Sequence, residues 1–275
     1  MQNDKTVDGV CVSFLERGQG NSHLLVHGSG ANKDYWHHLA NQLRPHHVIQ
    51  PDLLGHGETP AWHFMQQAPA QYHADCDLKL LETVLKDVPA PIKCVGHSAG
   101  GALCLEYARR NPHLVHSLVL FEPMVPSILK NNRQQAWQEV SEAYQKANAL
   151  VDEERQEEGA EYLFDYILGE QSWQRMPDFL KKLALTNTRT LAGHSLYSIQ
   201  NEMPLEWLSD FQKPVLLLCG DQSREPFRAI CEELQKRLPK AELRVLAGLG
   251  HNAPVTHPEQ VNPLILDFFA NWEGC

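Results

Sequence analysis

A serine between glycines stands near the middle of the chain, in the segment Ile92–Gly101. The apolar residues before the turn predict a short strand, and the residues after it predict a helix. Such a G-x-S-x-G turn, the nucleophile elbow, forces its central residue into a strained backbone conformation. Glycine is needed on either side because a Cβ there would collide with the neighbouring strand or helix. The hydroxyl of Ser98 is thereby exposed at the positive end of the following helix, as a nucleophile requires.

Strand-like and helix-like segments alternate on either side of this turn, a rhythm that predicts a parallel sheet covered by helices on both faces. The predicted strands span residues 10–16, 23–26, 48–49, 92–95, 117–121, 214–219 and 242–246. The predicted helices span residues 31–44, 71–88 and 99–110, followed late in the chain by one with Pro226 in its first turn. A terminal helix is expected to begin near Asn262, because Pro263 would break a helix interior.

The alternation stops between Met124 and Gln212. This segment lacks a good strand pattern, is helical in its periodicity, and contains three tryptophans. The acidic run at 152–158 is interpreted as a solvated helix face. We therefore predict a core formed by residues 1–123 and 213–275, with residues 124–212 as an inserted helical segment.

Composition excludes several classes of partner. The net charge is −10 and no basic run is present, which argues against nucleic acid and anionic membranes. No apolar run reaches the length of a membrane span, and the polar N-terminus has no apolar signal region. Seven unpatterned cysteines indicate reduced thiols in a cytoplasmic protein. The histidine pairs at 37–38 and 46–47 lack zinc-type partners, and Gly28–Gly30 lacks the remaining features of a dinucleotide site, so no metal or cofactor is expected.

Four motifs in order carry a resemblance to the α/β-hydrolase family across nearly the full chain. They are the His27–Gly30 turn, the Asp52–Glu58 loop, the Ser98 turn and the late Gly250–His251 pair, each after a predicted strand. The resemblance implies an α/β-hydrolase fold in which residues 124–212 form a helical cap over the active site. A small-molecule substrate would enter between cap and core.

The resemblance also implies roles for individual residues. Ser98 is the expected nucleophile, and His251 is the expected base, in preference to His97 beside the serine, whose side chain should point away. The backbone N–H groups of Ser29 and Ala99 are the expected oxyanion donors. The Ser29 hydroxyl either adds a donor or only stabilises its turn.

The acid of the triad is where the chain departs from the family's common pattern. Most relatives carry an aspartate three residues after the glycine that ends the strand following the cap, and here that position holds Ser223. Two carboxylates remain. Glu122 directly follows the preceding strand, at the alternative site used by some family members, and Asp221 lies on the same loop as Ser223. We favour Glu122 and keep Asp221 as the alternative.

These residues predict a serine hydrolase, carboxylesterase-like, that cleaves a small, largely apolar ester, lactone or related acyl or carbon–carbon substrate through an acyl-enzyme. The fold also hosts cofactor-free lyases and perhydrolases on the same triad, and fold does not settle function. A ligand-binding or receptor-like protein of the same fold is the alternative from a different class.

Overall fold

In the computed structural model, residues 1–61, 74–200 and 202–272 are described. Eight strands form one sheet in the order β1-β2-β4-β3-β5-β6-β7-β8. β2 pairs antiparallel with β1 and with β4, and every other neighbouring pair is parallel. The strands are β1 Gln2–Val7, β2 Val10–Arg17, β3 Ser22–Val26, β4 His47–Pro51, β5 Ile92–His97, β6 Val115–Phe121, β7 Val215–Gly220 and β8 Ala241–Leu246. The predicted mostly parallel sheet is confirmed, while β1 was not predicted because its residues are mainly polar.

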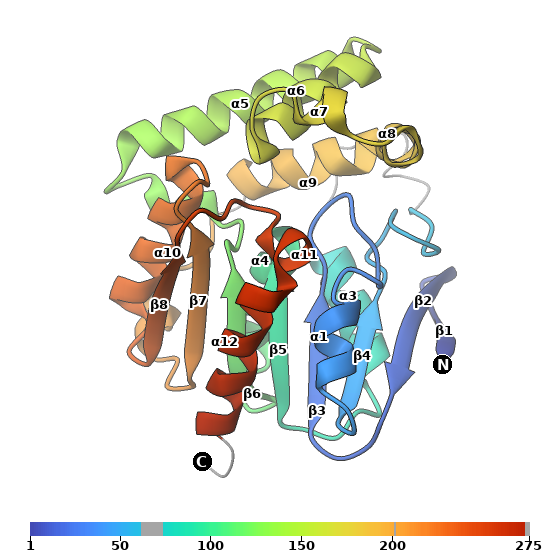
Figure 1. The fold of residues 1–275 in the computed structure, drawn as a ribbon, viewed down its shortest axis with the longest axis vertical. Helices are drawn as coiled ribbons and strands as arrows, with labels where there is room; N and C mark the ends of the chain where they lie inside the picture. Colours follow the sequence, from blue (N-terminus) through green and yellow to red (C-terminus); the bar gives the residue numbers. More distant parts are fainter. Residues whose placement is uncertain (62–73, 201, 273–275) are drawn as a thin grey trace.

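Helices cover both faces of the sheet, as Figure 1 shows. The core helices are α1 His37–Gln42, α3 Ala74–Leu85, α4 Ala99–Arg110, α10 Glu225–Arg237, α11 Ala253–Thr256 and α12 Pro258–Asn271. Alternate residues of a strand point to opposite faces. In β6, Leu118 and Leu120 join the apolar cluster under α3, α4 and α10, while Val119 and Phe121 join the cluster under α1 and α12. Burial on both faces explains why these strands are almost continuously apolar.

Two helices begin elsewhere than predicted. The terminal helix α12 begins at Pro258, so the prediction of a start near Asn262 is wrong, and Pro263 lies inside the helix. Pro263 and Glu259 are both exposed. Water can therefore satisfy the Glu259 carbonyl that the missing N–H of Pro263 leaves unpaired, while the apolar face of the helix remains packed. The regular part of α1 begins only at His37, after turns through residues 33–36. Residues 71–73 of another predicted helix lie outside the described residues.

A layer of helices connects β6 to β7 and lies across the upper edge of the sheet in Figure 1. We call it the inserted helices: the 3-10 turns η2 Pro126–Leu129 and η3 Glu206–Ser209, with α5 Gln134–Asp152, α6 Gln156–Leu168, α7 Ser172–Arg175, α8 Asp178–Thr186 and α9 Thr188–Gln200 between them. Within the described residues of 122–214 there is no strand. Val140, Leu163 and Leu191 share one apolar cluster with β5 and β6, so the inserted helices pack as part of the same hydrophobic core.

A membrane-spanning helix is absent from the described part of the chain, where no helix combines sufficient length with sufficient hydrophobicity.

Candidate active site

Ser98 lies in the turn between β5 and α4, with φ 52° and ψ −120°. A positive φ is costly for a residue with a side chain, so the surrounding contacts must hold it. The Ser98 N–H donates to the carbonyl of Phe121 at 3.0 Å, and the Ser98 carbonyl accepts from Met124 at 3.0 Å. The end of β6 therefore secures the turn from both sides, and the strained conformation expected from the motif is confirmed.

The glycines around Ser98 have no room for a side chain. A Cβ on Gly96 would lie 2.5 Å from the carbonyl oxygen of Gly100, and a Cβ on Gly100 would lie 2.3 Å from that of His27. Both obstacles are backbone atoms, which cannot move aside as a flexible side chain can. The collisions predicted from the sequence are confirmed, and they explain how α4 approaches β3 closely enough to place Ser98 at the sheet edge.

His251 and Glu122 form a buried pair. The Nδ1 of His251 lies 2.6 Å from the Oε2 of Glu122, and the other carboxylate oxygen accepts the N–H of Gly220 at 2.8 Å. The Glu122 side chain is 0% exposed, and the His251 side chain is 4% exposed. The His251 ring also packs against the rings of Phe227 and His97, with centroids 4.8 Å and 4.6 Å away. The carboxylate therefore orients an imidazole that its neighbours already hold in place.

Asp221, the alternative acid, faces a different partner. Its Oδ1 accepts the N–H of Gly248 at 2.7 Å and that of the Gln222 side-chain amide at 2.9 Å, so it stabilises the turn after β8. Ser223, at the position where most relatives carry the acid, is buried. The geometry thus brings Glu122, and not Asp221, to the histidine, while the catalytic role of either stays a prediction.

The turn after β3 carries Ser29, and two buried histidines of the core hold it. His27 Nε2 accepts the N–H of Leu53 at 3.1 Å, and its Nδ1 donates to the carbonyl of Gly28 at 2.8 Å. His56 Nε2 accepts the N–H of Gly30 at 3.0 Å. Burial lowers the pKa of His27 to about 3 and also lowers the pKa of His56. Both rings are therefore neutral at pH 7 and can keep the acceptor nitrogens that these bonds require.

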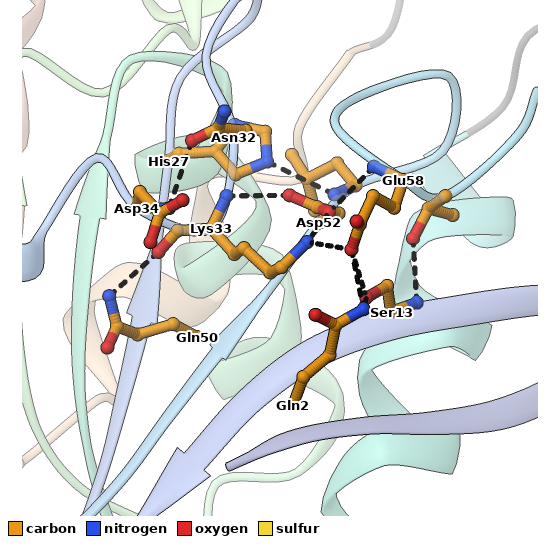
Figure 2. A network of polar contacts seen from close by, with 11 residues as sticks. Gln2, Ser13, His27, Asn32, Lys33, Asp34, Gln50, Asp52 and Glu58 are labelled. Carbon is orange, nitrogen blue, oxygen red and sulfur yellow. Dashed lines mark hydrogen bonds and ion pairs between the residues drawn. The ribbon is translucent and has the colours of Figure 1, made fainter.

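A buried ion pair, Lys33 with Asp52, lies a few residues further along the chain from the same turn (Figure 2). Lys33 Nζ lies 2.7 Å from Asp52 and 2.7 Å from Glu58, and the Lys33 N–H donates to Asp52 at 2.6 Å. Burial lowers the pKa of Lys33, but the hydrogen bonds to the two carboxylates outweigh it, so the net shift is upward. A Cβ on Gly57 would lie 2.3 Å from the Asp52 carboxylate. The predicted Asp52–Glu58 loop is therefore tied through its two carboxylates to Lys33, four residues after Ser29, while Gly57 leaves room for the Asp52 carboxylate.

One cavity of about 450 Å³ brings the predicted residues together. Ser98, Ala99, His251 and Ser29 all line it. Among the described residues, no hydrogen bond joins Ser98 to His251 in this substrate-free structure, and such bonds are often long before a substrate binds. The cavity's apolar walls come largely from the inserted helices, with Tyr144, Leu163, Phe164, Ile167, Met176, Leu183, Leu191 and Met203 among the lining residues.

The Asp and Glu side chains in the cavity wall are not matched there by basic Lys or Arg side chains from the described residues. Asp34, Asp77 and Glu106 line it, whereas no lysine or arginine does so within the residues that the structure describes. Glu106 is itself paired with Arg109 and Arg110. Among the described residues, no group of three or more His, Cys, Asp or Glu side chains is placed to hold a metal ion.

Another histidine at this cavity, His194 of α9, was not predicted from the sequence. Its Nδ1 lies 2.7 Å from the hydroxyl of Ser29. The sequence shows only that this histidine stands among apolar residues of the inserted segment. Periodicity alone cannot tell whether such a histidine faces a cavity or lies in the hydrophobic core.

The fold and this site define a class of protein. A model of the alpha/beta hydrolase family matches residues 24–264, and the chain belongs to that family. The resemblance read from the motifs and the predicted α/β-hydrolase fold are thereby confirmed.

Particular relatives are distant. A Bacillus subtilis protein with the provisional name 2-succinyl-6-hydroxy-2,4-cyclohexadiene-1-carboxylate synthase is 25% identical over 96% of this chain and 96% of its own length. The pimeloyl-[acyl-carrier protein] methyl ester esterase of Yersinia enterocolitica is 25% identical over 91% of this chain and 94% of its own. Among solved structures, a thermophilic esterase of Thermogutta terrifontis superposes with a TM-score of 0.75 at 19% identity, covering 99% of both chains. That structural likeness shows the fold alone.

Proposed function

We propose that the protein is a serine esterase for neutral, largely apolar acyl esters, with Ser98 as nucleophile, His251 as base and Glu122 as the acid that orients His251. The observation that carries the proposal is the buried His251–Glu122 pair, at 2.6 Å, whose histidine lines the same cavity as Ser98. A strained serine, an oriented imidazole and a shared cavity are the parts that acyl transfer needs.

The proposed reaction proceeds in two halves. Ser98 Oγ attacks the acyl carbon while its proton passes to Nε2 of His251, and Glu122 stabilises the imidazolium that forms. The N–H groups of Ser29 and Ala99 donate to the oxyanion. His251 then gives its proton to the departing alcohol, which leaves an acyl group on Ser98. In the second half, His251 takes a proton from a water molecule that attacks the acyl carbon. His251 then returns this proton to Ser98 Oγ as the acyl–Oγ bond breaks, which releases the acid and restores the serine.

The cavity wall supports a neutral substrate. An apolar acyl chain would bury its surface against the inserted helices, at about 0.8 kcal/mol for each CH₂ group. A carboxylate on the substrate would meet acidic residues and no described lysine or arginine among the lining side chains, and an unpaired buried charge is costly. A substrate rich in carboxylates is therefore disfavoured.

The test is a series of p-nitrophenyl esters of increasing acyl length, with Ser98→Ala as the inactive control. We expect the activity to rise with chain length until the cavity is filled. The p-nitrophenyl ester of succinic acid, which carries a free carboxylate, should give a kcat/KM at least about 100-fold below that of the butyrate ester. Equal rates for the two esters would contradict the assigned substrate class.

A ligand-binding protein of the same fold is the second candidate, and the cavity of about 450 Å³ with its largely apolar lining is what favours it. A fluorophosphonate probe separates the two, because an esterase is modified at Ser98 and a binding protein is not. Lyase or perhydrolase chemistry would appear as Ser98-dependent activity without net ester hydrolysis.

The inserted helices supply much of the cavity wall, which supports the division at residues 124–212 and a role of this segment as a cap. A cytoplasmic location is likewise a proposal, supported by the free state of the buried cysteines. Fractionation of cells that produce the protein would test it.

A further inference from the structure

Three segments far apart in the chain meet at the Ser29 side of the cavity. The Ser29 hydroxyl, in the turn after β3, lies 2.7 Å from Nδ1 of His194 on α9. On the opposite side of the ring, His194 Nε2 lies 3.6 Å from Oδ2 of Asp77 on α3. All three residues line the cavity that contains Ser98. Ser29, His194 and Asp77 therefore form a second serine–histidine–carboxylate series, and it connects a turn of the core to one of the inserted helices.

The surroundings of this series restrict its movement. His194 is 6% exposed and Asp77 is 1% exposed. The other oxygen of Asp77 accepts the N–H of Leu54 at 2.9 Å, which fixes the carboxylate to the loop after β4. The His194 ring stacks on the ring of His56, with centroids 5.2 Å apart and planes 23° apart. His56 in turn accepts the N–H of Gly30, directly after Ser29, so two histidines support one turn from adjacent positions.

Close packing between the layers strengthens the connection. A Cβ on Gly55 would lie 2.6 Å from the side chain of Thr190, one helical turn before His194 on α9. The core loop and α9 are therefore in direct contact beside the series. A shift of α9 away from the core would separate His194 from Ser29 and leave the serine hydroxyl without this support.

We propose that His194 is a positioning residue that fixes the Ser29 turn through the Ser29 hydroxyl, with the Asp77 carboxylate facing the other side of the His194 ring. The inference rests on the proposed function, in which the Ser29 N–H stabilises the oxyanion. Its consequence is that the oxyanion hole is complete only when α9 is seated on the core. Loss of the His194–Ser29 bond should therefore affect the transition state more than substrate binding.

The test is a double-mutant cycle on p-nitrophenyl butyrate. Ser29→Ala and His194→Ala should each lower kcat by roughly 10- to 50-fold and leave KM within about threefold, which is less than the loss of a whole oxyanion donor. Because both changes break the same bond, the double variant should be no slower than either single variant. Effects that multiply, or a change in KM with kcat intact, would overturn the proposal.

Two conservative variants distinguish positioning from packing. Asparagine places an amide atom near the position of Nδ1, so His194→Asn can keep the Ser29 bond. Glutamine places its amide near the position of Nε2, so His194→Gln can reach Asp77 but not Ser29. We expect His194→Asn to retain kcat within about fivefold and His194→Gln to match the alanine variant. The reverse order would contradict the proposal, and this pair still decides the matter should His194→Ala not fold.

Two controls complete the experiment. Thr186→Val removes a hydroxyl that donates to the Lys182 carbonyl of its own helix in the inserted segment, and it should leave the kinetics unchanged. Ser98→Ala reports on the proposed function by itself. A wild-type chain without Ser98-dependent hydrolysis would overturn the proposed function and this inference together. An active wild-type chain with independent Ser29 and His194 effects would overturn the inference alone.

Discussion

His251 meets Glu122 across 129 positions of the chain, with Nδ1 and Oε2 separated by 2.6 Å. The carboxylate comes from the residue after β6, whose φ of 44° turns the chain at the end of that strand. The N–H of Gly220, the last residue of β7, donates to the second oxygen of Glu122 at 2.8 Å. A side chain that begins one strand away from the usual site of the acid thus reaches the histidine.

This pairing predicts which carboxylate supports catalysis. Glu122→Gln keeps the shape of the side chain and removes its charge, so it should lower kcat by about 10³-fold or more. Asp221→Asn should stay within about threefold of wild type, because Asp221 binds the Gly248 turn rather than His251. Steady-state kinetics of the purified variants on a p-nitrophenyl ester measure both.

Glu122→Asp supplies the matched control for this prediction. It keeps the charge and shortens the reach by one methylene, so an intermediate loss of about 10- to 100-fold is expected. A collapse of Asp221→Asn with Glu122→Gln still active would instead assign the acid to Asp221.

Substitution of a glycine should be destabilising in proportion to the steric overlap that the new Cβ would meet. Gly100→Ala would place a Cβ 2.3 Å from the carbonyl oxygen of His27. We expect a loss of about 3 kcal/mol in the free energy of unfolding, measured by urea denaturation. Nothing lies within 4 Å of a Cβ on Gly250, so Gly250→Ala is the matched control and should unfold at nearly the wild-type urea concentration. Similar losses for the two variants would contradict the steric account of the elbow.

The Lys33–Asp52 pair should contribute to stability far more than an exposed pair (Figure 2). Lys33→Met leaves the fully buried Asp52 carboxylate without its partner, which should cost about 3 kcal/mol or more of unfolding free energy. Arg155→Ala breaks an exposed pair with Glu158 and should leave the unfolding free energy nearly unchanged, because solvent screens such a pair. Equal shifts in the thermal midpoint of the two variants would show that the buried pair has no special importance.

Stability should fall as the pH drops below neutrality. Burial lowers the pKa of His27 to about 3 and that of His23 to about 4, whereas both titrate near about 6.5 in the unfolded chain. Below that pH the unfolded state binds protons that the folded state does not. The stability that these two neutral histidines contribute is therefore fully present above about pH 6.5 and is lost as the pH falls towards 3–4.

At pH 5 the expected loss is about 2 kcal/mol for each of these two histidines relative to pH 7.5. Urea unfolding at the two pH values measures it. His23→Gln should show a smaller loss than the wild type, because it removes one of the two titrating groups. A midpoint that does not change between pH 7.5 and pH 5 would refute the proposed linkage.

Local patterns were sufficient for much of this fold. The alternation of apolar strands and helices predicted the parallel sheet, since each strand buried on both faces must be apolar at nearly every position. The elbow at Ser98 was also predictable, because its glycines are required by atoms only a few residues away, apart from the close approach to His27. The polar strand β1 and the interior Pro263 were not predictable, because their environment at the sheet edge or helix surface is set by the rest of the molecule.

The choice between two carboxylates shows what sequence alone determines and what it does not. The order of the motifs places Ser98 and His251 after strands of one parallel sheet, and the carboxyl ends of such strands share an edge. Spacing along the chain also left Glu122 and Asp221 as candidates, but the direction of each side chain depends on backbone angles and distant hydrogen bonds. The hydrogen bond from Gly220 to Glu122 and the contact of His194 with Ser29 each join segments that are far apart in the chain. The positive φ at Glu122 directs its side chain towards Gly220 and His251. Only the packing of those segments in three dimensions selects these partners.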